Sequence, residues 1–259
     1  MDTTPQLHAQ AVRLRFHRAL LASMAFVVVL GAIQFGLPWL AGVRTLTLIP
    51  QHWPGLVGVI TAPLLHGSPG HWLGNASAIL LMGPLVGTVY PRAALRALPL
   101  IWILSGLGTW VIGQPSFHIG ASGVTHGLLF LLLFLGLLRR DRAAIAAALI
   151  AFFFYGGMLL TVLPREPGVS WEYHLCGALA GVLAAVIWRR ADPAPPRQRY
   201  SWDDEPEEPE PDPEFEPPSP PEVPVLWLRP DEPRGKVLPF RPRGGGDAGA
   251  DPEAGAGDR

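Results

Sequence analysis

The sequence has a single cysteine, and charged residues are scarce before about residue 190. Cys176 lies inside an apolar run, so the chain has no disulfide framework and no cysteine-based zinc site. The formal net charge of −1 hides a split, because basic residues concentrate in the first part of the chain and acidic residues in the remainder. The overall charge therefore gives no argument for a nucleic-acid partner. We expect no metal and no cofactor.

The N-terminal region lacks the pattern of a cleavable signal peptide. Its basic residues Arg13, Arg15 and Arg18 precede an apolar segment that is longer than the core of a signal peptide. No clear cleavage site with small residues follows it. We interpret this segment as a first transmembrane helix that stays in the protein.

Long apolar runs dominate the chain up to about residue 190 and are typical of membrane-spanning helices. The pattern predicts an all-α membrane protein whose six transmembrane helices form a bundle in the lipid bilayer. The six predicted spans cover residues 20–41, 71–90, 96–113, 117–138, 143–163 and 171–189.

Arginine placement predicts the orientation of these spans, since cytoplasmic loops carry an excess of basic residues. The loops on the opposite side offer only Arg44 and Arg165. Both termini are therefore expected in the cytoplasm, in a multi-pass protein of the cell (inner) membrane. The arginines on the predicted cytoplasmic side are Arg13, Arg15, Arg18, Arg92, Arg96, Arg139, Arg140, Arg142, Arg189 and Arg190.

Three regions follow from this reading: a cytoplasmic segment 1–17, a six-helix membrane domain 18–190, and a tail 191–259. The tail is rich in proline and acidic residues and cannot bury enough apolar surface to fold, so it is expected to be disordered and cytoplasmic. An apolar island from Val223 to Phe240 has two interpretations. It is a binding motif for a cytoplasmic partner, or it is an incidental patch.

Polar residues inside a membrane are costly and indicate function. The second, fourth and sixth spans all start on the outer side, and each carries polar residues within about two turns of its start. His71 and Asn75 are four residues apart and share one helical face, Ser122 lies in the fourth span, and His174 lies in the sixth. We predict that these four side chains meet at one depth and form a site that opens outward.

The chemistry of such a site is that of a serine nucleophile. Ser122 needs a base to accept its proton, and His174 is the residue of the sixth span suited to that task. An oxyanion would need donors, for which the side chains of Asn75 and His71 and the backbone N–H of Ser122 are candidates. No acidic residue lies at this depth in the three spans, so the pattern favours a Ser-His dyad.

Glycines surround these residues and allow two interpretations. Gly120 and Gly123 let the backbone near Ser122 approach a substrate, whereas Gly177 lets the fourth and sixth spans pack closely. Taken alone, the small residues Gly123 and Gly127 favour helix packing over catalysis. The convergence of the polar residues is what favours a catalytic site.

Three motifs make the chain similar to the rhomboid intramembrane serine proteases. His66-Gly-Ser-Pro-Gly-His71-Trp-Leu-Gly-Asn75 resembles the family's H-x4-H-x3-N pattern, and Gly120-Ala-Ser122-Gly123 resembles its GxSG motif. The sixth-span histidine with its glycines, His174 to Gly181, completes the resemblance, which covers about residues 18–190.

The resemblance implies a rhomboid-type fold and an enzyme that cuts transmembrane segments of other membrane proteins near small residues. It implies that Ser122 is the nucleophile, that His174 is the base, and that His71 and Asn75 form the oxyanion hole. His66 would brace the first loop. One departure is His126, which stands where the family often has an aromatic residue packed on the catalytic histidine, so it either packs there or takes part in proton transfer.

Two other functions compete with the protease. A non-catalytic rhomboid-like protein would bind transmembrane segments without cutting them, and such relatives generally lose the serine or the histidine that this chain keeps. A haem or metal protein would use His66, His71, His126 and His174. That role favours histidines that face each other in mid-membrane, whereas these lie toward one surface.

Overall fold

A computed structural model describes residues 4–36, 43–164 and 168–193 of the chain. The chain divides into two compact units, Met1–Arg197 and Gln198–Arg259, and all described residues belong to the first. The predicted tail 191–259 lies outside the described residues from 194 onward, as does its island Val223 to Phe240.

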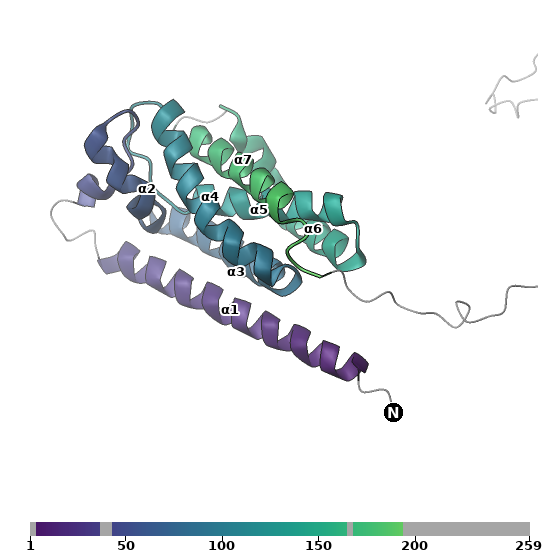
Figure 1. Cartoon of the computed structure of the whole chain (residues 1–259). Coiled ribbons are helices and arrows are strands. Elements are labelled where there is room, and N and C mark those ends of the chain that lie inside the picture. Colours follow the sequence, from purple (N-terminus) through teal and green to yellow (C-terminus); the bar gives the residue numbers. More distant parts are fainter. Residues whose placement is uncertain (1–3, 37–42, 165–167, 194–259) are drawn as a thin grey trace, which may run out of the picture. The chain divides into compact units, whose positions relative to one another are not determined.

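The described part contains six helices that are long and apolar enough to cross a membrane (Figure 1), which confirms the predicted all-α membrane protein. The arrangement makes this a multi-pass membrane protein. The helices are α1 (Thr4–Gly36), α3 (Pro69–Val89), α4 (Pro91–Ile112), α5 (Ser122–Arg139), α6 (Arg142–Tyr155), which a 3₁₀ helix (Gly156–Val162) continues, and α7 (Trp171–Trp188).

Two helix starts differ from the sequence prediction. Helix α1 begins at Thr4 rather than near residue 20, because no helix-breaking residue interrupts the chain around its arginines. Helix α5 begins at Ser122 rather than near residue 117. Gly120 has φ +107°, a conformation that a helix does not contain, and His118 pairs with Leu48 in an isolated antiparallel bridge. Ser122 is therefore the first residue of its helix rather than a residue within it.

Short helical segments connect α1 to α3 and rest on α4. They are the 3₁₀ helices Val43–Leu46, Trp53–Val57 and Ala62–Leu64 and the single-turn helix α2 (Gly58–Thr61). Two tryptophans of α4 donate hydrogen bonds to this connection, Trp102 Nε1 to Ile60 O at 3.2 Å and Trp110 Nε1 to His52 O at 3.0 Å. The connection is thereby fixed against α4. Backbone hydrogen bonds of Leu48 with His118 and from Gly120 N to Ala62 O join it to the segment that precedes α5.

Close packing of α5 against α7 fixes the centre of the bundle. A Cβ added at Gly177 would lie 2.0 Å from the carbonyl oxygen of Gly123, and one added at Gly181 would lie 2.2 Å from that of Gly127. No side chain fits at such distances, so these positions must be glycine for the two backbones to approach. The predicted packing of the fourth and sixth spans is confirmed.

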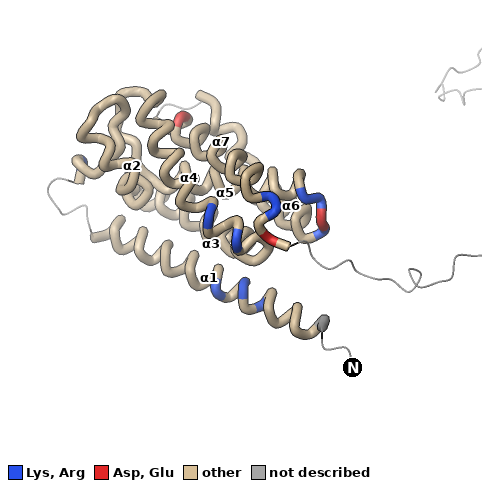
Figure 2. Tube along the Cα trace, in the orientation of Figure 1, with Lys and Arg blue, Asp and Glu red and all other residues tan. Residues whose placement is uncertain are grey.

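Charged residues gather at the C-terminal ends of α5 and α7. Figure 2 shows a cluster of arginines at one end of the bundle, on α1 and at the α4, α5, α6 and α7 termini, whereas Arg44 lies apart from them beside Phe117. Two acidic residues there cap helices, because Asp141 accepts from Ala144 N at 2.8 Å and Asp192 accepts from Arg92 N at 2.9 Å and Ala93 N at 3.0 Å. The packed domain therefore extends past residue 190, where the sequence analysis had placed its end, to at least Asp192.

Candidate active site

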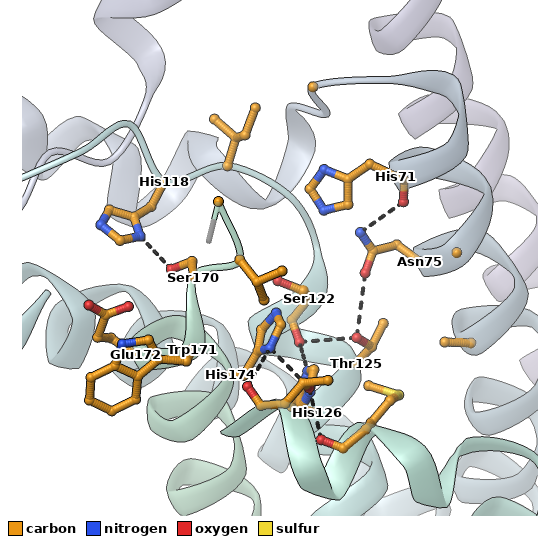
Figure 3. Close-up of a pocket in the computed structure, with 18 of the residues that line it drawn as sticks. His71, Asn75, His118, Ser122, Thr125, His126, Ser170, Trp171, Glu172 and His174 are labelled. Carbon is orange, nitrogen blue, oxygen red and sulfur yellow. Dashed lines mark hydrogen bonds between the residues drawn. The ribbon is translucent and has the colours of Figure 1, made fainter. Parts of the chain in front are cut away.

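A cavity of about 1220 Å³ lies at the end of the bundle away from the arginines and brings together the predicted site residues. Helix α5 connects the two ends of the bundle, because it begins at Ser122 in the cavity and ends at Arg139 in the arginine cluster. The predicted residues that line the cavity are His71 and Asn75 from α3, Ser122 and His126 from α5, and His174 from α7 (Figure 3). His118, Ser170 and Glu172 line it as well. The expectation that no acidic residue lies at this depth is therefore wrong, because Glu172 is buried in the first turn of α7. Its carboxylate accepts from Gln114 N at 3.2 Å, and among the described residues it makes no hydrogen bond to His174.

Gly120 shapes the turn that leads into Ser122. A Cβ at this position would lie 2.5 Å from both Cε1 and Nε2 of His71 and 3.5 Å from Nδ2 of Asn75. The positive φ of Gly120 adds a second reason why a side chain is strained there. The turn therefore brings the backbone before Ser122 directly against the two predicted oxyanion donors. The start of α5 also leaves the N–H groups of its first turn without partners inside the helix.

Hydrogen bonds orient the amide of Asn75. Its Nδ2 donates to His71 O at 3.2 Å, and its Oδ1 accepts a long hydrogen bond of 3.5 Å from the hydroxyl of Thr125. Because an amide nitrogen carries two hydrogens, one remains available for a ligand in the cavity. Thr125 was not predicted as a site residue. Its spacing of three from Ser122 was the only signal, and Thr125 Oγ1 also lies 3.0 Å from the carbonyl of Ser122.

His126 and His174 form a stacked pair, which agrees with the packing reading that the sequence analysis gave as one of two alternatives. Their ring centroids are 3.9 Å apart and their planes differ by 13°. His126 Nδ1 lies 2.7 Å from Ser122 O, so this histidine contacts both members of the predicted dyad. Within the described residues, no hydrogen bond joins the Ser122 hydroxyl to His174. Such bonds often tighten only when substrate binds.

His66 precedes α3 and lies outside the membrane-spanning helices, and its ring packs against His71 of α3. The two rings meet edge to face with centroids 5.1 Å apart. Burial, reinforced by the nearby His71, lowers the pKa of His66 to about 4. Two histidine pairs thus form, His66 with His71 and His126 with His174. Among the described residues, no group of three or more His, Cys, Asp or Glu side chains is placed to hold a metal ion.

His118 is a further contributor to the cavity, and it lies in the loop before α5. It is buried to 3% exposure, its Nδ1 is hydrogen-bonded to the hydroxyl of Ser170, and its Nε2 lies 3.0 Å from Gln114 O. Ser170 immediately precedes α7 and accepts from the backbone N–H of His174 at 3.2 Å through its carbonyl. Ring contacts of a loop histidine thereby fix the start of the helix that carries His174 (Figure 3).

A comparison with known protein families finds a match over the region that contains these motifs. The family model of the rhomboid domain matches residues 53–191, which is more than half of the chain. The chain belongs to the rhomboid family. The match covers helices α3 to α7 and every residue discussed in the cavity.

Individual relatives include two uncharacterized proteins and one that is named as a rhomboid protein. An uncharacterized protein of Mycobacterium tuberculosis is 44% identical over 147 residues, covering 53% of this chain and 61% of the relative. An uncharacterized protein of Mycobacterium leprae is 38% identical over 141 residues, covering 51% and 56%. A protein of Acanthamoeba polyphaga mimivirus that is named as a rhomboid protein is 24% identical over 140 residues, covering 51% and 75%. The match thus spans less than two thirds of the length of the mycobacterial relatives.

Proposed function

We propose that this rhomboid protein is a serine endopeptidase that cleaves transmembrane segments of other membrane proteins. The observation that carries the proposal is the shared cavity of Ser122 and His174, inside a membrane domain, with His126 in contact with both. A hydroxyl and an imidazole at the start of two tightly packed helices are the minimum needed for acyl transfer.

The reaction follows from the placement of these groups. His174 Nε2 takes the proton of Ser122 as Oγ attacks the scissile carbonyl, and the resulting imidazolium returns that proton to the leaving amine. The oxyanion accepts hydrogen bonds from the free N–H of Asn75, from His71 and from the backbone N–H of Ser122. Water then hydrolyses the acyl-enzyme with His174 again as base. The cavity gives that water access from the bundle end.

The arginine distribution supports an orientation for this reaction. Basic residues concentrate at the bundle end opposite the cavity, and such residues mark the cytoplasmic side (Figure 2). We therefore place both termini in the cytoplasm of a cell with the protein in its inner membrane, and the active site toward the extracytoplasmic side. Substrates would then be cut near their outer membrane boundary.

A non-catalytic rhomboid-like protein is the second candidate. It is favoured by the missing hydrogen bond between the Ser122 hydroxyl and His174 in the described part of the chain, since a binding protein would not need it. The two candidates differ in one measurable property. Both would bind a transmembrane segment, and only the protease would release fragments of it.

The deciding experiment is cleavage of a model transmembrane substrate by purified protein in detergent. We expect Ser122→Ala and His174→Ala each to abolish fragment release, because members of a dyad act as a unit. Both variants should still insert in the membrane and bind the substrate. Equal fragment release by wild type and Ser122→Ala would show that a contaminant cuts the substrate, and it would leave the binding function in place.

A further inference from the structure

Thr161 enters the cavity from the segment that the sequence analysis predicted as the fifth span, residues 143–163. At Gly156, α6 changes into a 3₁₀ helix that runs to Val162. Two consecutive glycines weaken the α-helix at this point, and a 3₁₀ helix places every third residue on one edge. Tyr155, Met158 and Thr161 have this spacing, and all three line the cavity. The change of helix type therefore gives α6 a polar contact with the catalytic histidine.

Thr161 contacts both rings of the histidine pair. His126 Nε2 lies 2.8 Å from its hydroxyl, and His174 Nδ1 lies 3.1 Å from both its hydroxyl and its carbonyl. The hydroxyl also lies 2.9 Å from Met158 O. One hydroxyl proton therefore has more acceptors within reach than it can serve, and its position must follow from the protons of the two rings.

The contact between His126 and the carbonyl of Ser122 determines where His126 carries its proton. A carbonyl only accepts, so His126 Nδ1, 2.7 Å away, carries a proton. Neutral His126 then has a lone pair at Nε2, and the Thr161 hydroxyl must donate to it. If that hydroxyl donated to Met158 instead, Nε2 would also need a proton, and a charged His126 would stack on His174 in a buried site. Such a charge is costly, so the first arrangement holds.

This arrangement determines the protonation of His174. The carbonyl of Thr161 can only accept, and its hydroxyl has already used its proton on His126, so both oxygens accept from His174 Nδ1–H. With the proton on Nδ1, the lone pair of neutral His174 lies on Nε2. That is the nitrogen that a base needs toward Ser122.

We propose that Thr161 is the positioning residue of this dyad, holding His174 by Nδ1 in the tautomer whose Nε2 is free to accept the proton of Ser122. It takes the part that a carboxylate takes in a Ser-His-Asp triad, where the acid orients the imidazole and fixes its tautomer. A neutral acceptor does this without placing a charge in the membrane domain. The inference rests on the proposed protease function.

The test compares Thr161→Val with Thr161→Ser and a matched control. Valine keeps the shape of threonine and the backbone carbonyl but removes the hydroxyl, and serine keeps the hydroxyl. Thr88→Val is the control, because among the described residues the Thr88 hydroxyl bonds to Pro84 O of its own helix, 2.5 Å away, and Thr88 does not line the cavity. Each protein is assayed for kcat and KM on the transmembrane substrate, and for the rate at which a fluorophosphonate labels Ser122.

We expect Thr161→Val to lower both kcat and the labelling rate on the order of 10-fold, as for a buried hydrogen bond whose partner is left unpaired. KM should stay within about 2-fold, because the hydroxyl acts on the base and not on substrate binding. Thr161→Ser and Thr88→Val should both stay within about 2-fold of wild type. Full activity of Thr161→Val would overturn the proposal. So would equal losses in Thr161→Val and Thr161→Ser, which would mean that the methyl group matters through packing.

A spectroscopic readout separates this inference from the protease function itself. In ¹⁵N-histidine-labelled protein, the His174 signals are those missing from His174→Ala. We expect wild type to show His174 protonated at Nδ1. In Thr161→Val the backbone carbonyl still accepts from Nδ1–H, so this tautomer should persist with a shifted and broadened Nδ1 signal, because one of its two acceptors is lost. A proton on Nε2 in wild type would overturn the inference even in an active enzyme. Wild-type protein that neither cuts nor reacts with fluorophosphonate, yet shows the Nδ1–H form, would overturn the protease function while the tautomer assignment stands.

Discussion

The two ends of the membrane domain satisfy their polar groups in different ways. At the arginine end, charged side chains close helix termini: Asp192 accepts from two backbone N–H groups of α4, and Arg139 binds Asp141 at 3.1 Å and the carbonyl of Asp192 at 2.8 Å. At the cavity end, one buried acidic residue, Glu172, accepts from the backbone N–H of Gln114 at 3.2 Å, and the residues of the predicted catalytic site contact one another through neutral side chains. Asn75 and His174 each keep part of their hydrogen-bonding capacity unused there.

This difference separates stability from function. A capping carboxylate with its hydrogen bonds complete stabilises the fold and has nothing left for a ligand. A buried histidine or amide that uses only part of its hydrogen-bonding capacity lowers the stability of the fold. Such groups are kept at sites that have a function. Substitutions at the arginine end should therefore change stability more than activity, and substitutions at the cavity end should do the reverse.

Beyond the dyad itself, the largest effect is expected at the oxyanion donors. Asn75→Ala should lower turnover on the order of 10²–10³-fold, as loss of one oxyanion donor does in soluble proteases. His71→Ala should act similarly, and unfolding temperatures should change little. Thr88→Val again serves as the matched control, since Thr88 lies on the same helix, its hydroxyl bonds to Pro84 O at 2.5 Å, and it does not line the cavity. Full turnover in both α3 variants would remove the oxyanion role from this helix.

The histidine pair should show the next effect. His126→Ala leaves a hole beside the catalytic ring and should lower kcat on the order of 10-fold or more. His126→Phe keeps a ring to stack on His174, and the Thr161 hydroxyl can then donate to Met158 O while still accepting from His174. That variant should keep turnover within about 3-fold of wild type. A His126→Phe protein as inactive as Ser122→Ala would make His126 a participant in proton transfer.

The sequence predicted the features that depend on repeated or local patterns. Six apolar runs predicted six helices, and Gly123, Gly127, Gly177 and Gly181 predicted the α5–α7 packing, because close approach of two helices leaves a mark in residue size. The contact of His126 with His174 was one of two readings that the family resemblance left open, and the stacked rings agree with the packing reading. The site residues Ser122, His174, His71 and Asn75 lie together, and their catalytic roles stay a proposal.

Features that depend on backbone detail were missed. Thr161 reaches the cavity only because α6 becomes a 3₁₀ helix, and a 3.6-residue period places it elsewhere around the helix axis. Asp192 caps α4 from a position about a hundred residues further along the chain, so no local capping pattern announces it. Helix α5 starts five residues later than predicted, since the left-handed conformation of Gly120 is not visible as a break in hydropathy.

At the arginine end, Asp192→Ala should lower the free energy of unfolding by about 1–2 kcal/mol, the usual cost of losing a helix cap. Turnover per folded molecule should not change, because the residue lies at the opposite end of α7 from His174. Thermal unfolding in detergent measures the first quantity, and Asp192→Asn, which keeps an acceptor, should recover part of the loss. A drop in kcat without a drop in stability would contradict the separation of the two ends.

The smallest expected effect concerns His66, whose half-buried ring packs against His71 and resists protonation. The pKa of His66 is about 4 in the folded protein, below the value of about 6.5 for a free histidine. Between these values the unfolded chain binds a proton at His66 that the folded chain does not. The contribution of neutral His66 to the free energy of unfolding is therefore fully present above pH 6.5 and is lost as the pH falls toward 4. His66→Phe keeps a ring against His71 and cannot take up this proton. We therefore expect the unfolding temperature of wild type to fall more between pH 8 and pH 5 than that of His66→Phe. Because His66 is neutral in both states at pH 8, any difference there reports packing alone, and equal pH dependence in the two proteins would show that His66 is protonated as readily in the fold as out of it.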